Sequence, residues 1–104
     1  AALTRRNMAD LVQASRARWG TELPWIVGLP DDTAPFHAAV RAGLVELDRA
    51  DPAMAAFDTR DYTTQPDGLH YDAASVIRLG RDFYEAWLEL SSSRQPPPPQ
   101  SARL

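Results

Sequence analysis

The sequence predicts a mixed α/β fold with parallel strands, and three observations lead to this class. Helical and strand-like segments alternate along the chain, as in domains built on a parallel sheet. The two strand-like segments are short and largely apolar, which is typical of strands covered on both faces. The segment between them has helical periodicity, and a strand–helix–strand unit closes in a right-handed sense with its strands parallel.

The first helix is predicted over residues 4–19, where apolar side chains recur at helical spacing. Gly20 follows directly and favours an end to the helix. A strand is predicted over residues 23–29, a nearly uninterrupted apolar run in which Pro24 is tolerated only near the beginning. The inward stripe of the helix consists of Met8, Leu11, Val12, Ser15 and Trp19.

A second helix is predicted over residues 35–49, after a polar turn whose oxygens can cap it. A second and weaker strand prediction covers residues 53–57. The polar stretch over residues 58–72 comes next and is too long for a simple connector, so we treat it as a candidate site loop. The apolar positions of the second helix are Phe36, Val40, Leu44 and Leu47.

The third helix is predicted over residues 73–90, with one face formed by Val76, Leu79, Gly80, Phe83 and Trp87. Beyond it, over residues 91–104, the composition turns to Ser, Gln, Arg and Pro. We therefore expect a folded domain over residues 1–90, followed by a disordered, proline-rich tail. The large aromatic side chains on the periodic faces are expected in the core, and these are Trp19, Trp25, Phe36, Phe83 and Trp87.

The composition excludes several classes of function. The chain has 104 residues, a net charge of −3 and 44% hydrophobic residues, which is the balance of an ordinary globular domain. It has no Cys, so disulfides, a thiol nucleophile and cysteine-bound metals are excluded. Its mild acidity gives no electrostatic reason to expect a nucleic acid partner. No apolar run approaches the roughly 20 residues that span a bilayer, so we expect no membrane partner.

The number of strands indicates that the domain is incomplete. Parallel sheets usually have about four to six strands and are covered on both faces. Both predicted strands have the apolar character of interior strands, yet each can pair only with the other. We therefore expect the chain to be the C-terminal part of a larger, doubly wound domain.

A candidate site lies in the loops that follow the two strands, over residues 30–35 and 58–72, because working loops of doubly wound folds leave the carboxyl ends of the strands. The second loop contains Asp67 and His70, three residues apart, with Gly68 between them. A bend at the glycine lets the carboxylate accept a hydrogen bond from imidazole Nδ1–H. Nε2 is then free to take a proton from a hydroxyl nucleophile.

These residues resemble the last conserved block of the SGNH hydrolases. The block is Asp-Gly-Leu-His-Tyr-Asp-Ala-Ala-Ser over residues 67–75, leading into a C-terminal helix. The likeness is to the sialate O-acetylesterase and acetylxylan esterase group, carbohydrate esterase family six. It extends upstream through Arg-Ala-Arg-Trp-Gly-Thr-Glu-Leu-Pro-Trp-Ile-Val over residues 16–27, and through the features at 40–41, 50–52 and 57–59. In all, it covers roughly residues 3–90.

The resemblance implies a flavodoxin-like three-layer α/β/α fold and hydrolysis of acetyl esters on sugars. It implies that His70 acts as general base and then general acid, and that Asp67 orients it. An acetylated carbohydrate would be the substrate, and neither a cofactor nor a metal is expected. The family's serine nucleophile lies in a Gly-Gln-Ser-Asn or Gly-Asp-Ser type block near the N-terminus, and no such block occurs here. We therefore expect the chain alone to be inactive and to need an N-terminal half as its partner.

Further residues are expected around the substrate. Tyr62 and Tyr71, in the long loop, and Asp31, after the first strand, are candidates for lining the cleft. His37 lies near Asp31 in sequence, and we interpret it as a surface residue of the second helix.

Two other hypotheses remain. In the first, the chain is a non-catalytic α/β interaction module that uses an unpaired sheet edge to form a homodimer or to bind a partner strand. In the second, carboxylates and imidazoles bind Zn or Mn. The residues from which such a metal site could be drawn are Asp31, Asp32, His37, Asp67, His70 and Asp72.

Overall fold

The computed structural model describes residues 1–94, and its elements follow the predicted order. Residues 95–104, most of the predicted tail, lie outside the described residues. The helix predicted to end at residue 90 continues for four more residues, so the first residues assigned to the tail are helical. The elements are α1 (Ala2–Trp19), β1 (Trp25–Leu29), α2 (Pro35–Ala50), β2 (Met54–Asp58) and α3 (Ala73–Arg94).

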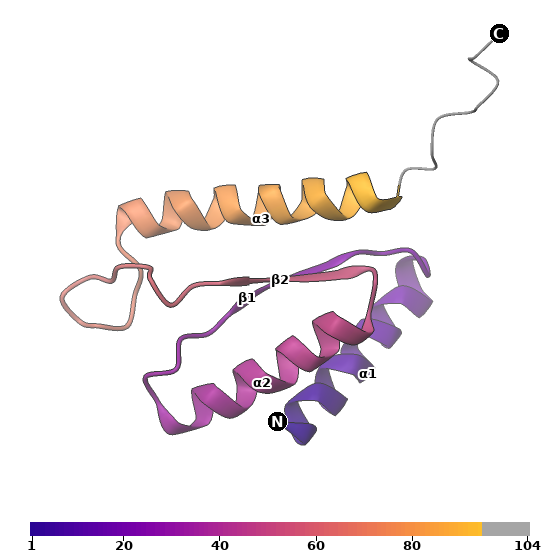
Figure 1. Ribbon diagram of the computed structural model, residues 1–104, viewed down its shortest axis with the longest axis horizontal. Coiled ribbons are helices and arrows are strands. Elements are labelled where there is room, and N and C mark those ends of the chain that lie inside the picture. The colour runs from indigo at the N-terminus through magenta and orange to yellow at the C-terminus, as the bar shows by residue number, and fades with distance from the viewer. Residues whose placement is uncertain (95–104) are drawn as a thin grey trace, which may run out of the picture.

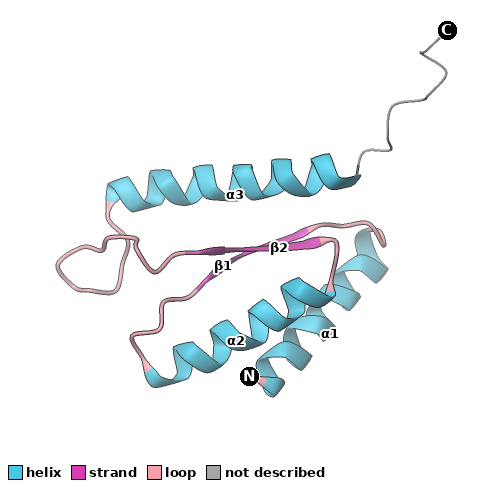
Figure 2. Cartoon of the chain, in the orientation of Figure 1, coloured by secondary structure: helices cyan, strands magenta, loops and turns pink. Residues whose placement is uncertain are grey.

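The two strands form a parallel pair with α1 and α2 on one side and α3 on the other (Figures 1 and 2). Trp25 is paired with Met54 at one end of the sheet, and Leu29 is paired with Asp58 at the other. The predicted mixed α/β class with parallel strands is confirmed. Within the described residues the sheet has two strands, so the complete flavodoxin-like arrangement stays a prediction.

Side-chain hydrogen bonds hold both ends of the strand pair. At the carboxyl end, buried Thr59 donates from Oγ1 to the carbonyl of Leu29 at 2.6 Å. At the amino end, the guanidinium of Arg16 in α1 contacts the Asp51 carboxylate at 2.6 Å and donates to the carbonyl of Leu23 at 3.0 Å. The Arg16 contacts connect α1, the turn before β2 and the segment before β1.

α1 and α2 approach closely at Gly43. A Cβ atom at this position would lie 2.6 Å from the carbonyl oxygen of Ala1 and 3.1 Å from the backbone nitrogen of Arg5. Only the absence of a side chain allows this approach.

The core is small, and several aromatic residues predicted to lie in it are exposed. Trp19 is 70% exposed at the end of α1, and Phe36 and Trp87 are also exposed. Phe83 is partly covered, because its ring packs edge-on against Phe57 at a centroid distance of 4.9 Å. Two strands give the helices only a narrow surface, and the rotation of α3 described below turns Trp87 away from it. The buried hydrophobic residues are Val12, Leu29, Leu44, Leu47, Met54, Tyr62, Ala86 and Leu90.

The strand β1 also departs from the prediction that it is buried on both faces. Leu29 is its only buried residue, and the other four are partly exposed.

The face of α3 that packs on the sheet differs from the predicted face by about a quarter of a turn. Buried positions of the helix are Ser75, Ala86 and Leu90, whereas Val76 and Trp87 on the predicted face are exposed. Polar contacts explain the difference, because Ser75 and Asp82 hydrogen-bond to the loop that precedes α3.

Candidate functional site

The loop over residues 59–72 leaves the carboxyl end of β2 and holds Asp67 and His70 in contact. Asp67 Oδ2 lies 2.6 Å from His70 Nδ1. Asp67 Oδ1 accepts the backbone N–H groups of Leu69 at 2.9 Å and of His70 at 3.0 Å. Gly68 between them has φ of 69°, a left-handed conformation that favours glycine. The contact expected from the Asp-x-x-His spacing is present.

The environment of this pair keeps Asp67 ionised. The pKa of Asp67 is lowered mainly by the hydrogen bond to His70, and further by the backbone N–H groups of Leu69 and His70. The His70 side chain is 69% exposed, and no hydrogen bond to Nε2 is formed within residues 1–94. A neutral His70 with its proton on Nδ1 would present Nε2 to solvent as a base. The pair can therefore accept a proton from a group brought to it.

No serine hydroxyl in the described part of the chain bonds to His70. Ser15 is buried, donates to the carbonyl of Val12 and accepts the indole N–H of Trp25 at 2.9 Å. Ser75 is also buried and accepts the backbone N–H of Thr63 at 2.8 Å. Both hydroxyls have structural roles, and neither is a partner of His70.

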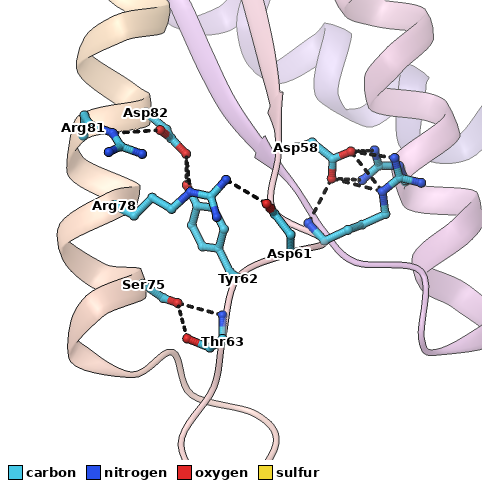
Figure 3. Close-up of polar contacts among 10 residues, drawn as sticks. Asp58, Asp61, Tyr62, Thr63, Ser75, Arg78, Arg81 and Asp82 are labelled. Atoms are coloured by element: carbon cyan, nitrogen blue, oxygen red, sulfur yellow. Dashed lines mark hydrogen bonds and ion pairs between the residues drawn. The ribbon is translucent and has the colours of Figure 1, made fainter.

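The site loop is attached to α3 through Tyr62 (Figure 3). The Tyr62 hydroxyl donates a short hydrogen bond to Asp82, and the Arg78 guanidinium lies 4.7 Å from the centroid of its ring. Arg78 also bonds to Asp61 at 3.0 Å. Burial and the Asp82 carboxylate raise the pKa of Tyr62 to about 12. Tyr62 is thus a buried anchor of the loop, and its expected place in the lining of a substrate cleft stays a prediction.

A second attachment lies at the start of α3. Thr63 donates from Oγ1 to Asp72, and the Asp72 carboxylate also accepts the backbone N–H of Ser75 at 2.9 Å. These contacts cap the helix and close the base of the loop. Tyr71, the other aromatic cleft candidate, is half-buried and packs its ring against that of Tyr62 at 5.3 Å.

A second Asp–His pair follows β1, and sequence reasoning missed it. Asp31 Oδ1 lies 2.8 Å from His37 Nδ1 and also accepts the backbone N–H and the hydroxyl of Thr33, at 3.1 and 2.7 Å. These bonds lower the pKa of Asp31 to about 2, with His37 the largest contributor. The Asp-x-Thr sequence over residues 31–33, before a helix, is a signal that predicts the turn. It does not predict the contact between Asp31 and His37. Asp31 is therefore a turn residue whose Oδ1 accepts several hydrogen bonds, and its expected place in the lining of the cleft stays a prediction.

An ionic cluster at the carboxyl end of β2 was also missed. Asp58 is bonded by Arg41 from α2 at 2.8 Å and by Arg60 from the site loop at 2.7 Å. The two guanidinium groups hold the pKa of Asp58 well below its usual range, with Arg60 the largest cause. Arg60 also lies 3.7 Å from Asp32. The cluster connects the loops that follow both strands.

The structure shows no candidate site for the hypothesis of a bound metal ion in the part of the chain that it describes. Within residues 1–94, no three His, Asp or Glu side chains are grouped so that they could hold a metal ion. None of the helices in this range is long and apolar enough to cross a membrane.

Comparison with known protein families, curated sequences and solved structures finds no match to this chain.

Proposed function

We propose that this chain is the C-terminal portion of an SGNH-type serine esterase that removes acetyl groups from carbohydrates. The observation that carries the proposal is the contact between Asp67 and His70 in the loop at the carboxyl end of β2. An exposed imidazole held by a carboxylate through Nδ1 is the part of a serine triad that accepts and returns the proton. The sequence around it, over residues 67–75, resembles the corresponding block of these esterases.

In this reaction, each member of the pair has a defined role. His70 Nε2 takes the proton of a serine hydroxyl as the oxygen attacks the acetyl carbonyl. It then gives this proton to the sugar oxygen as the bond from the acetyl carbon to that oxygen breaks, and the sugar leaves with a free hydroxyl. Asp67 holds the imidazole with its proton on Nδ1 and stabilises the imidazolium that forms. The same residues then activate water to hydrolyse the acetyl-serine. No Gly-x-Ser type block occurs in these 104 residues, so the proposal requires the serine and the oxyanion-binding groups to be supplied by another part of the protein.

The two edges of the sheet differ in a way that favours further strands beside β1. On the outer edge of β2, the Asp48 carboxyl of α2 lies close enough to the backbone N–H of Ala56 to interact with it. The pKa of Asp48 is raised because the effect of burial outweighs the favourable interactions of its carboxylate with Ala56 and Arg49. A carboxyl placed against an edge N–H opposes strand addition there. Addition at β1 instead gives a wider parallel sheet of the flavodoxin-like kind, with β2 at its edge.

The first test uses the chain alone. Acetate release from acetylated sugars is expected to be absent, because a base without a nucleophile forms no acyl-enzyme. Turnover by the isolated chain that disappears in His70→Ala would show that this portion carries its own nucleophile.

The second test uses the longest protein encoded by the reading frame that contains this chain. We expect a Gly-x-Ser type block upstream and deacetylation that falls by about 10³-fold or more in His70→Ala. His37→Ala is the matched control, because His37 belongs to the other Asp–His pair, and activity is expected to persist. A reading frame without a serine block, or activity that survives His70→Ala, would contradict the proposal.

The interaction-module hypothesis is supported by a different observation. Within the described residues, β1 pairs only with β2, so one of its edges is open. Because Trp25 N–H donates to the carbonyl of Ala53, the N–H groups of Ile26 and Gly28 face the open edge. In a module that pairs through this edge, hydrogen exchange at these two amides slows as the concentration rises. In an isolated esterase portion it stays fast at all concentrations.

A further inference from the structure

The side of α3 that faces away from the sheet has a run of exposed apolar residues, which we call the outer stripe. Ile77 is 76% exposed, and Tyr84 and Trp87, whose rings stack at a centroid distance of 6.2 Å, are also exposed. So many exposed large apolar side chains along one helix are unusual for a protein surface. The outer stripe consists of Ile77, Gly80, Tyr84, Trp87 and Leu88.

Much of the outer stripe lies opposite the side of α3 that packs on the sheet. At 100° per residue, Ile77 and Tyr84 lie half a turn from the buried positions Ala86 and Ser75. Strands added at the edge of β1 would widen the sheet beneath α3, but they would not cover the far side of the helix. The outer stripe therefore needs an occupant of its own, whatever completes the sheet.

The spacing of the outer stripe suits a second helix. Ile77, Gly80, Tyr84 and Trp87 recur at intervals of three and four residues, which is the pattern of a seam between two helices. Gly80 lies near its centre, and a Cβ atom there would have nothing within 4 Å. A large side chain of the opposing helix can fill this space.

The charges beside the outer stripe identify the second helix and its direction. Arg81 and Glu85 flank the stripe and are 61% and 64% exposed, with Arg81 nearer the start of α3. When two copies of α3 pair in antiparallel fashion, Arg81 of each copy approaches Glu85 of the other. In parallel two-fold pairing, this flank of one helix lies on the opposite side of the seam from the same flank of the other, so these charges do not meet. The helix is thus complementary in charge to its own reversed copy.

We propose that the outer stripe of α3 docks a second copy of this chain, with the two helices antiparallel about a two-fold axis near Phe83. In this register, Trp87 of one copy lies over Gly80 of the other, and Ile77 lies against Leu88. Arg81 and Glu85 form two equivalent ion pairs across the axis, as an isologous interface requires. The interface is separate from the open edge of β1.

The test exchanges the flanking charges in the full chain and measures association by sedimentation equilibrium. The unaltered chain is expected to form dimers at micromolar concentrations. Arg81→Glu and Glu85→Arg each place like charges across the axis, so each is expected to raise the dimer dissociation constant by about tenfold or more. An equimolar mixture of the two variants restores opposite charges at both pairs and is expected to dimerise as tightly as the unaltered chain.

The mixture also separates an interface effect from a folding effect. Within one copy, Arg81 and Glu85 lie 3.9 Å apart, so each single substitution also disturbs its own helix, and mixing cannot repair that damage. Arg5→Glu is the matched control, because Arg5 is an exposed α1 residue paired with Glu46 at 4.0 Å, and it is expected to leave the dimer unchanged. Three results would overturn the proposal: a chain that is monomeric at about 1 mM, dimers that are insensitive to both substitutions, or a mixture no tighter than its components.

Discussion

Asp67 contacts His70 with one carboxylate oxygen, at 2.6 Å from Nδ1, and contacts the loop backbone with the other. The first contact selects the tautomer of the imidazole, and the second holds the carboxylate in place. Substitution of Asp67 by Asn separates the two effects, because the side-chain oxygen can still accept the backbone N–H groups.

In Asp67→Asn, the amide NH₂ donates to Nδ1, so the imidazole proton is expected to move to Nε2. The outward nitrogen then has no lone pair for a proton. The measurement is the pair of ¹⁵N shifts of His70 at about pH 9, well above the ordinary pKa of a free imidazole. His37 provides an internal control whose shifts stay unchanged. Identical His70 tautomers in both proteins would show that Asp67 does not orient the ring.

The stability of the fold is expected to fall in acid, partly through Asp31. Its pKa is about 2 in the folded chain, against an ordinary value of 3.8, so below about pH 4 the unfolded chain takes up this proton first. The stabilisation is fully present above that pH and is lost as the pH falls towards 2. Unfolding free energies at pH 6, 4 and 2.5 should decline less steeply in Asp31→Asn than in the unaltered chain. Asp10→Asn, on exposed α1, is the control, and equal slopes in all three proteins would contradict the assignment.

Tyr62 is expected to ionise late in an alkaline titration. Its pKa of about 12 exceeds the ordinary value of 10, so the stabilisation it provides is present below about pH 10 and is lost between pH 10 and 12. Absorbance near 295 nm should show one of the three tyrosines ionising at about pH 12, and Tyr62→Phe should remove that step. The same substitution removes the bond to Asp82 and is expected to cost about 1–3 kcal/mol of unfolding free energy. If Tyr62→Phe instead removes an ionisation step near pH 10, Tyr62 is not the buried anchor of the loop.

Two helical glycines are expected to respond to alanine in opposite directions. Gly43→Ala places a methyl group 2.6 Å from the carbonyl of Ala1, so it should destabilise the fold by about 1–3 kcal/mol. Gly80→Ala meets no atom and should stabilise α3 by up to about 1 kcal/mol through helix propensity. Denaturant unfolding in dilute solution measures both. Equal effects would mean that α1 and α2 do not approach each other at Gly43.

Local interactions account for what could be predicted about the site. Asp67 and His70 are three residues apart, and a glycine turn alone brings them together. The order of the elements was likewise predictable, because hydrophobic period and turn residues act over a few positions. The ionic cluster around Asp58 could not be predicted from local sequence, because Arg41 lies seventeen residues away on another element. The pairing of Asp31 with His37 depends on how the turn after β1 enters α2.

The sequence by itself determined the five elements, the parallel pairing of the strands and the contact between Asp67 and His70. Only the tertiary structure decided which side of α3 packs on the sheet. The apolar pattern favours Val76 and Trp87 as the inward residues, yet Ser75 and Asp82 face the protein because they bond to Thr63 and Tyr62 of the site loop. Those bonds determine how α3 is rotated about its axis. The helical periodicity of a sequence reflects the spacing of its apolar residues, and it gives no information about the hydrogen-bond partners of its polar residues. The same rotation positions the outer stripe away from the sheet.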